Sequence, residues 1–319
     1  MHEFELIKNY FQKLSKKSPS ALNLNDDVFF DKKNRLAVSV DTYVEGNHFI
    51  DFQKPELVIK KIIRSSISDL ICKGVLPKYY FVSGSGNKKS FSKSNLSKIS
   101  KSLNREQNRY NILLGGGDTV FSNKLSFTIT SIGFSKDIIY RNKGKVNDDI
   151  YVSGNLGDSY LGLLVLQKKI KLNNILNKYF TTQYFMPDIK LELANELKNF
   201  ANTSIDISDG LLADLDKLIN NQKLSYKLNL KNIPISNNLK KVLKLKNLSK
   251  INFISRGDDY QVLFTASKVK AGIIKRISSR LGVKITKIGI IQNKPLKSLI
   301  IDHNNAVITL KNKGYLHKF

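Results

Sequence analysis

Residues 35–44 read RLAVSVDTYV, and residues 55–73 read PELVIKKIIRSSISDLICK. The first stretch alternates apolar and polar side chains and ends in a polar turn, which predicts a β-strand. The second begins with Pro55, which suits the first turn of a helix, and Gly74 after it can end that helix. The apolar side chains of this helix recur on one face: Leu57, Val58, Ile62 and Ile63. A strand followed by an amphipathic helix is the unit of an α/β layer.

Strands and helices alternate in this way through most of the chain. In the first half we expect strands over 78–83, 110–114 and 124–134 and a polar helix over 93–103. The tract 135–149 is short of apolar residues and predicts a junction between domains. The elements expected beyond it are strands over 150–153, 225–230, 260–265 and 284–291 and helices over 158–169, 187–200, 211–221 and 268–281. The predicted fold class is α/β with mixed sheets, in two domains that comprise residues 1–138 and 139–319.

The composition restricts the possible classes of protein. With 319 residues, 41% of them hydrophobic and 25% charged, the chain is long enough for two folded domains. Cys72 is the only cysteine, which excludes a disulfide framework, a cysteine-rich zinc site and an iron–sulfur cluster. The first 17 residues have no continuous apolar core, and no later stretch approaches the roughly 20 apolar residues that span a membrane. We therefore expect a cytoplasmic protein with no membrane partner.

The chain is strongly basic, since 53 Lys and Arg residues against 26 Asp and Glu residues give a formal net charge of +27. Such a charge can bind nucleic acid by displacing counterions from the phosphates. The lysines are spread along the whole chain, however, and no zinc-finger spacing, RNP aromatic motif or basic zipper is present. We therefore expect the basic surface to attract anionic metabolites rather than to make nucleic acid the main ligand.

Aspartates are scarce in this basic chain, yet they recur beside Gly, Ser or Thr at predicted turns and element ends. A single aspartate in such a place can simply cap a turn. The recurrence instead favours coordination of Mg²⁺, which prefers oxygen ligands from carboxylates and substrate phosphates. The aspartates concerned are Asp26, Asp27, Asp41, Asp69, Asp118, Asp206, Asp209, Asp258 and Asp259.

Two glycine-containing segments suit phosphate binding. Gly115–Gly117 follows a predicted apolar strand, and glycines there let the backbone approach a nucleotide, with Asp118 next in the chain. No GxxxxGK[ST] sequence occurs, so this segment is not a Walker A loop. The segment 154–159, GNLGDS, begins a predicted helix and fits either an anion-binding nest or an ordinary helix start.

In their order along the chain, these motifs resemble those of the thiamine-monophosphate kinase family, which shares a superfamily with aminoimidazole ribonucleotide synthetase and selenophosphate synthetase. They are Asp26-Asp27, Ser39–Thr42, Gly46–Phe49, Ser68–Leu70, Gly116–Thr119, Arg141, Ile205–Leu211, Gly257–Tyr260 and Gly314–His317. The IDISDGL segment at 205–211 and the order of the whole set are the most specific features. The resemblance covers essentially the whole chain. It implies a two-domain α/β fold, usually dimeric, that transfers the γ-phosphoryl group of ATP to thiamine monophosphate with several Mg²⁺ ions.

The resemblance also implies roles for individual residues. The expected Mg²⁺ ligands are Asp27, Ser39, Asp41, Asp69, Asp118 and Asp206, with Asp209 as a further candidate. The expected ATP contacts are Tyr110, Gly116, Gly117, Arg141 and Ser208, and the expected thiamine-monophosphate contacts are His48, Asp258 and Tyr315. Among these residues, the expected catalytic groups are Asp118, Arg141 and Asp209. No general base is required, because the attacking phosphate has a second pKa of about 6 and is largely ionised at neutral pH.

The chain departs from the family pattern where Gly, Thr, Asn, Arg and Glu are usual; these positions hold Asn25, Val40, Ser66, Phe121 and Asp258. A selenophosphate-synthetase role would need a reactive cysteine near the N-terminus, whereas Cys72 is expected to be a packed core residue. Two alternative hypotheses stay open. One is an enzyme similar to aminoimidazole ribonucleotide synthetase, and the other is a basic nucleic-acid-binding protein on a decayed enzyme fold.

Overall fold

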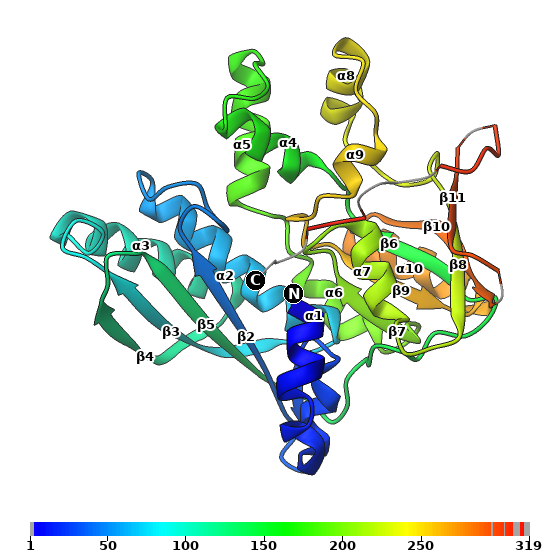
Figure 1. Cartoon of the computed structure of the whole chain (residues 1–319), viewed down its shortest axis with the longest axis horizontal. Coiled ribbons are helices and arrows are strands. Elements are labelled where there is room, and N and C mark those ends of the chain that lie inside the picture. Colours follow the sequence, from blue (N-terminus) through cyan, green and yellow to red (C-terminus); the bar gives the residue numbers. More distant parts are fainter. Residues whose placement is uncertain (1–2, 295, 303, 309–312, 316–319) are drawn as a thin grey trace.

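Two β-sheets, one from each half of the chain, organise the computed structural model, which describes residues 3–294, 296–302, 304–308 and 313–315 (Figure 1). The five strands of the first sheet lie in the order β1-β2-β5-β3-β4. They are β1 (Phe29–Asp31), β2 (Leu36–Val44), β5 (Ser126–Phe134), β3 (Pro77–Gly86) and β4 (Leu113–Phe121). Most neighbours are antiparallel, but β3 and β4 are parallel. The sheet is therefore mixed, as the sequence predicted.

The second sheet has six strands among the described residues, in the order β11-β8-β10-β6-β9-β7. They are β11 (Leu299–Ile301), β8 (Leu224–Asn229), β10 (Ile285–Asn293), β6 (Asp149–Ser153), β9 (Val262–Ala266) and β7 (Thr203–Asp206). Strands β6, β7 and β9 are completely buried. Their side chains lie in the interior, as is typical of strands that are covered on both faces.

Helix α2 (Pro55–Cys72) is the central helix, because it contacts both sheets. It packs on β2 and β5 of the first sheet beside α3 (Lys93–Tyr110), and its other side contacts β7 of the second sheet. Ile59 and Ile63 of α2 belong to the same buried apolar cluster as Phe264 of β9. The two halves therefore share one continuous core, and α2 holds them in fixed apposition.

The other helices belong to the second half. They are α4 (Asp158–Leu166), α5 (Asn174–Phe185), α6 (Leu191–Leu197), α7 (Leu211–Leu218), α8 (Asn237–Leu245), α9 (Ile251–Ile254) and α10 (Ala271–Leu281). In Figure 1, α4 with α5 and α8 with α9 project from the top of the molecule. At the N-terminal end of the chain, α1 (Glu3–Leu6), the π-helix η1 (Ile7–Phe11) and the 3-10 helices η2 (Leu14–Lys17) and η3 (Pro19–Leu24) precede β1. Within the described residues, no helix is long and apolar enough to cross a membrane.

Several predicted boundaries were wrong. Tyr110 ends α3 instead of starting a strand, because Asn111 adopts the left-handed conformation that closes the helix. The glycine run 115–117 lies inside β4 and not in a turn, with an irregular register beside it. A Cβ at Gly117 would overlap the carbonyl of Val82 on β3, so close strand packing alone requires a glycine there. The helix predicted over 187–200 is shorter, and seven of the α-helices and β-strands were not predicted: α1, β1, α5, β7, α8, α9 and β11.

One face of the first sheet is uncovered. Alternate residues of its strands point away from α2 and α3, and several of these side chains are apolar and exposed: Val40, Tyr79, Phe81 and Phe134. Strand β4 at the edge is exposed along its whole length and adds further apolar side chains: Leu113, Leu114, Val120 and Phe121. An apolar sheet face with an open edge is typical of a protein–protein interface.

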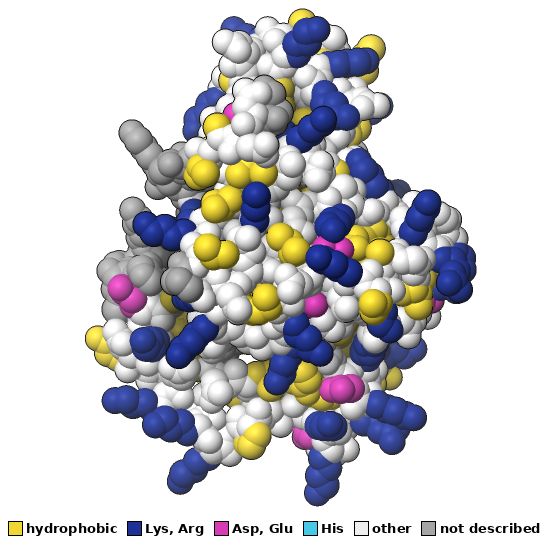
Figure 2. Space-filling view, turned by 90° about the vertical axis from the view of Figure 1, so that its right-hand side faces the viewer, with side chains coloured by type: hydrophobic (Ala, Val, Ile, Leu, Met, Phe, Trp, Pro, Cys, Tyr) yellow, Lys and Arg dark blue, Asp and Glu magenta, His cyan; other side chains and the backbone are white. Residues whose placement is uncertain are grey.

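The basic side chains are dispersed over the surface. Figure 2 shows Lys and Arg scattered across one face of the molecule, with few acidic groups and separate apolar spots among them. This face agrees with the dispersed distribution of lysine along the sequence.

A glycine in α4 allows the tight packing of α4 against α5. A Cβ at Gly162 would overlap the carbonyl oxygen of Phe180, so we expect Gly162→Ala to lower the free energy of unfolding by about 1–3 kcal/mol. The control is Gly272→Ala in α10, where no atom lies within 4 Å of the added carbon. That substitution should be neutral or stabilise the protein by up to about 1 kcal/mol. Urea unfolding measures both, and equal effects of the two substitutions would contradict the packing argument.

Candidate functional site

Three carboxylates meet where α2 contacts the second sheet. Asp27 follows η3, Asp69 lies in the last turns of α2 and Asp206 ends β7. One ligand oxygen from each lies within 4.8 Å of the others. The fold thus gathers into one group three aspartates that the sequence separates widely.

Two serine hydroxyls position the carboxylates. Ser39 Oγ on β2 donates to Asp69 Oδ2 at 2.7 Å, and Ser68 Oγ on α2 donates to Asp206 Oδ2. Ser68 and Asp69 are adjacent on α2, so the helix directs one side chain to the group itself and the other to the carboxylate from β7. This network connects β2, α2 and β7 at one point.

Asp41 extends the group from β2. Burial raises the pKa of Asp41 to about 7, and the negative charge of Asp206 adds to the shift. Burial likewise raises the pKa of Asp69, with contributions from Asp41 and Asp206, and burial raises the pKa of Asp206. Buried carboxylates that repel each other in this way favour a bound cation. The ligand atoms are all oxygens, which fits Mg²⁺ better than a metal that prefers sulfur or nitrogen.

Two cations flank Asp27. The buried ammonium of Lys73 lies 2.6 Å from Asp27 Oδ2 and 2.7 Å from Asp26 Oδ1, and it also donates to the carbonyl of Ser204. Arg141 pairs with Asp27 through Nη2, and its backbone N–H donates to Asp26 Oδ2 at 2.9 Å. The buried Nε of Arg141 has no hydrogen-bond partner among the described residues. An unsatisfied guanidinium N–H beside the carboxylates is suited to a phosphate oxygen.

Asp209 lies on the other side of the group, in the turn between β7 and α7. Its carboxylate pairs with Lys217, which also pairs with Asp214 at 2.8 Å. Burial opposes the charged form of Lys217, but the two carboxylates together raise its pKa. Asp214 Oδ2 accepts the backbone N–H groups of Asp209 and Gly210, so the turn that presents Asp209 is held rigidly.

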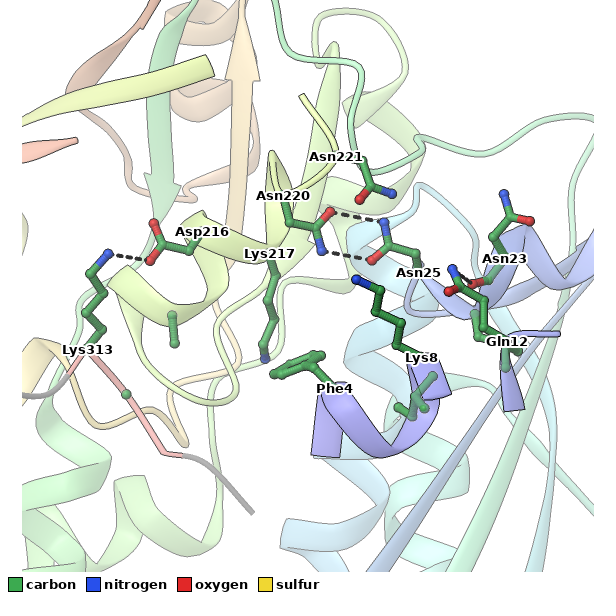
Figure 3. A pocket seen from close by; sticks show the side chains of 14 residues that line it. Phe4, Lys8, Gln12, Asn23, Asn25, Asp216, Lys217, Asn220, Asn221 and Lys313 are labelled. Atoms are coloured by element: carbon green, nitrogen blue, oxygen red, sulfur yellow. Dashed lines mark hydrogen bonds and ion pairs between the residues drawn. The ribbon is translucent and has the colours of Figure 1, made fainter. Parts of the chain in front are cut away.

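A cavity of about 500 Å³ adjoins the Asp209 side of the site. Figure 3 shows that its walls come from the N-terminal segment, from α7 and from Lys313. Asn25 and Asn220 exchange two hydrogen bonds across it, of 3.0 and 2.8 Å, and the ammonium of Lys217 lies over the ring of Phe4. The cavity therefore combines an apolar wall with amide and ammonium groups. Its lining residue Asn25 precedes Asp26 in the chain, and its lining residue Lys217 pairs with Asp209.

The residues expected to contact thiamine monophosphate are connected by a chain of contacts. Asp258 pairs with the buried ammonium of Lys61 at 2.7 Å, and its backbone N–H donates to Ser208 O at 2.9 Å. The ammonium of Lys61 lies 4.0 Å from the ring centroid of Tyr184, whose hydroxyl donates to the carbonyl of His48. The third residue, Tyr315, donates its backbone N–H to Asp209 O at 3.0 Å. Leu316 and His317 of the terminal motif lie outside the described residues.

Four predicted site residues lie elsewhere in the single chain. Asp118 is in register with Ser83, Thr128 and Thr42, and it therefore points to the face of the sheet opposite Asp41. Gly116 and Gly117 share this exposed edge strand. Tyr110 is buried at the end of α3, with the guanidinium groups of Arg64 and Arg109 over its ring. The single chain does not bring these residues to the group around Asp69.

In the segment 154–159, a carboxylate of the chain itself lies at the start of helix α4. The backbone N–H of Gly157 donates to both oxygens of Asp259, at 3.0 and 2.9 Å. Of the two interpretations of this segment, the structure favours an ordinary helix start.

Sequence reasoning missed the buried cations Lys61 and Lys73 and the pair Asp214–Lys217. The signal for the two lysines was their position among apolar residues, Lys61 on α2 and Lys73 directly after it, where a cation needs a partner from elsewhere in the fold. Cys72 is completely buried, and burial raises the pKa of its thiol, which confirms that it is a packed core residue.

The fold and this site define an α/β protein of the class that contains aminoimidazole ribonucleotide synthetase. Residues 24–135 match the family described as AIR synthase related protein, N-terminal domain. In structure the chain is similar to AaThiL complexed with AMPPCP and TMP, with a TM-score of 0.86, 25% identity and coverage of 99% of this chain and 97% of that chain.

Full-length relatives narrow the assignment. The thiamine-monophosphate kinase of Buchnera aphidicola subsp. Acyrthosiphon pisum (strain APS) is 35% identical, over 99% of this chain and 98% of that protein. The thiamine-monophosphate kinase of Escherichia coli (strain K12) is 30% identical over the same shares. The chain belongs to the thiamine-monophosphate kinase family.

The raised pKa of Asp41 predicts a pH dependence of stability without divalent ions. From about pH 4 to pH 7 the folded state binds this proton more tightly than the unfolded chain, so stability falls as pH rises through this window. In EDTA we expect the thermal unfolding midpoint of the wild type to decrease as the pH rises from 5 to 8. The midpoint of Asp41→Asn should decrease less over the same range. Asp31→Asn is the control. The pKa of Asp31 is lowered from 3.8, so the Asp31 carboxylate keeps its charge between pH 5 and pH 8. An Asp41→Asn profile parallel to wild type would contradict this.

Proposed function

We propose that this protein transfers the γ-phosphoryl group of ATP to the phosphate of thiamine monophosphate, which gives thiamine diphosphate. The observation that carries the proposal is the buried carboxylate group next to Arg141, whose Nε lacks a partner among the described residues. Two phosphate-bearing substrates repel each other, so catalysis depends on charge neutralisation and positioning. Carboxylates that hold cations and an arginine that holds phosphate oxygens provide both.

The residues that would hold Mg²⁺ are Asp27, Asp69 and Asp206, with Asp41 and Ser39 beside them. When bound, the ions would neutralise charge on the phosphate oxygens. Asp209 follows Asp206 by three residues and pairs with Lys217, and we retain it as a further ligand. Arg141 pairs with Asp27 and Ser208 follows Asp206 by two residues, and we assign both to the ATP phosphates.

The side chains around the site support direct transfer without a covalent enzyme intermediate. The hydroxyls of Ser39 and Ser68 donate hydrogen bonds to Asp69 and Asp206, the carboxylates that would hold Mg²⁺, so we assign them the role of positioning those ligands. The thiol of Cys72 is buried with a raised pKa, and His48 Nδ1 accepts the backbone N–H of Val44. The phosphate of thiamine monophosphate is itself ionised at neutral pH and can attack directly.

The substrate side would bind a cationic thiazolium and a flat aminopyrimidine. His48, Asp258 and Tyr315 supply a ring, a carboxylate and an exposed aromatic face. Asp258 already neutralises Lys61, so it would stabilise a second cation less than a free carboxylate would. Because the proposed reaction uses ATP, we expect it to take place in the cytoplasm.

A homodimer accounts for three of the four residues that lie apart. Asp118, Gly116 and Gly117 occupy the open edge of an uncovered apolar sheet face, which is where a second copy would pack. In such a dimer, these residues of one copy would contact the ATP and metal bound at the site of the other copy. We propose that the dimer forms through β4 and the face that carries Val40 and Phe81. Tyr110 is buried and stays a prediction.

The proposed reaction is tested by incubating the protein with Mg-ATP and thiamine monophosphate and measuring thiamine diphosphate. Asp206→Asn removes a buried carboxylate of the group, so we expect kcat to fall by at least about 100-fold. Glu192→Gln, which removes an exposed carboxylate on α6, should leave kcat unchanged. Free thiamine should not react, because it has no phosphate nucleophile. Full activity of Asp206→Asn would refute the metal assignment.

Assembly is tested with a charge on β4. Val120→Lys places a cation on the exposed edge and should shift the protein from dimer to monomer in sedimentation velocity, with loss of kinase activity. Ile175→Lys is the matched control, since Ile175 is an exposed aliphatic residue on α5, far along the chain from β4. A wild-type protein that sediments as an active monomer would overturn the proposal.

A further inference from the structure

A second polar cavity, of about 460 Å³, lies between the two halves of the chain and away from the acidic group. Lys60 and Arg64 of α2 and Arg105 and Arg109 of α3 form its basic wall. The opposite wall belongs to the second half, from Thr182 and Gln183 of α5 to Asp188. None of these residues is used in the proposed reaction.

The acidic residues at this cavity are already neutralised. Glu106 is held by Arg64 through two hydrogen bonds, of 2.8 and 3.2 Å, and Asp188 pairs with Lys190. The three remaining cations are Lys60, Arg105 and Arg109, and none of them forms an ion pair with a described residue. The cavity therefore carries an excess of about three positive charges that the chain itself does not balance.

The kind of cation is informative. Only eight of the 53 basic residues are arginines, and three of these eight line this one cavity. A dispersed basic surface in a lysine-rich chain would not concentrate arginine at one place. The planar guanidinium can bind two phosphate oxygens at once, which an ammonium cannot.

The spacing of these basic residues along α2 and α3 destabilises the two helices. Lys60 and Arg64 are one helical turn apart on α2, and Arg105 and Arg109 are one turn apart on α3. Like charges at this spacing destabilise a helix by roughly 0.2–0.5 kcal/mol per pair. Arg64 is offset by Glu106, but Arg105 and Arg109 are exposed without an acidic partner among the described residues.

We propose that this cavity is a second binding site, for a small phosphorylated metabolite whose phosphate is held by Arg105 and Arg109. Lys60 adds a third positive charge, and Thr182 and Gln183 provide hydrogen bonds to the rest of the molecule. Arg64 donates to the carbonyl of Pro187 at 3.2 Å and thereby connects α2 to the second half at the floor of the site. A bound anion would hold α3 and the 182–188 segment together.

Inorganic pyrophosphate in EDTA at 0.15 M salt tests the site. Without divalent ions the acidic group repels the probe, so binding reports on the basic cavity. Isothermal titration should show binding to the wild type, at least tenfold weaker in Arg105→Gln/Arg109→Gln. The matched control is Lys98→Gln/Lys101→Gln, which removes two exposed charges from the same helix and should bind like wild type.

Three outcomes would overturn the proposal. They are an absence of pyrophosphate binding to the wild type, equal weakening in both double variants, and unchanged affinity in the arginine variant. Equal weakening would indicate general attraction to a basic surface. Circular dichroism of both variants establishes that α3 remains folded, and the test needs no kinase activity.

Discussion

The burial of several carboxylates at the junction between α2 and β7 is the constraint on which the rest of the structure depends. Asp69, Asp206 and Asp41 lose hydration on folding, which raises the pKa of each; the charge of Asp206 also raises the pKa of Asp41, and the charges of Asp41 and Asp206 raise that of Asp69. Such an arrangement persists only where cations compensate it. Lys73 and Arg141 compensate Asp27 on one side, and the remaining negative charge is what a divalent ion would neutralise. Folding thus brings negative charges together that the chain does not fully neutralise, and this electrostatic repulsion favours the binding of a cation.

The same junction explains why the two halves share one core. Asp69 belongs to the helix of the first half and Asp206 to the sheet of the second, so any relative displacement would separate the ligands. Buried lysines reinforce the apposition, because Lys73 donates to Ser204 and Lys61 pairs with Asp258 across the junction. A buried ammonium without its partner would be strongly destabilising. The substrate side and the metal side therefore depend on one rigid helix.

The sequence predicted the α/β class, the central helix and most of the acidic group, because these follow from periodicity and from motifs with a physical meaning. It did not predict where Asp118 would lie. Its position depends on strand order and register, which place β4 at an edge and Asp118 on the face opposite Asp41. Strand β7 was missed because four residues are too few to show a period. The partners of Lys61 and Lys73 come from the distant second half, so only the tertiary structure identifies them.

The central claim is that the buried carboxylates hold divalent ions against the phosphates. Anomalous diffraction from crystals grown with Mn²⁺ and a non-hydrolysable ATP analogue tests it most directly. We expect Mn²⁺ peaks at coordination distance from Asp27, Asp69 and Asp206, with the terminal phosphate beside Arg141. Nucleotide bound elsewhere, with no metal peak among these three carboxylates, would contradict the account.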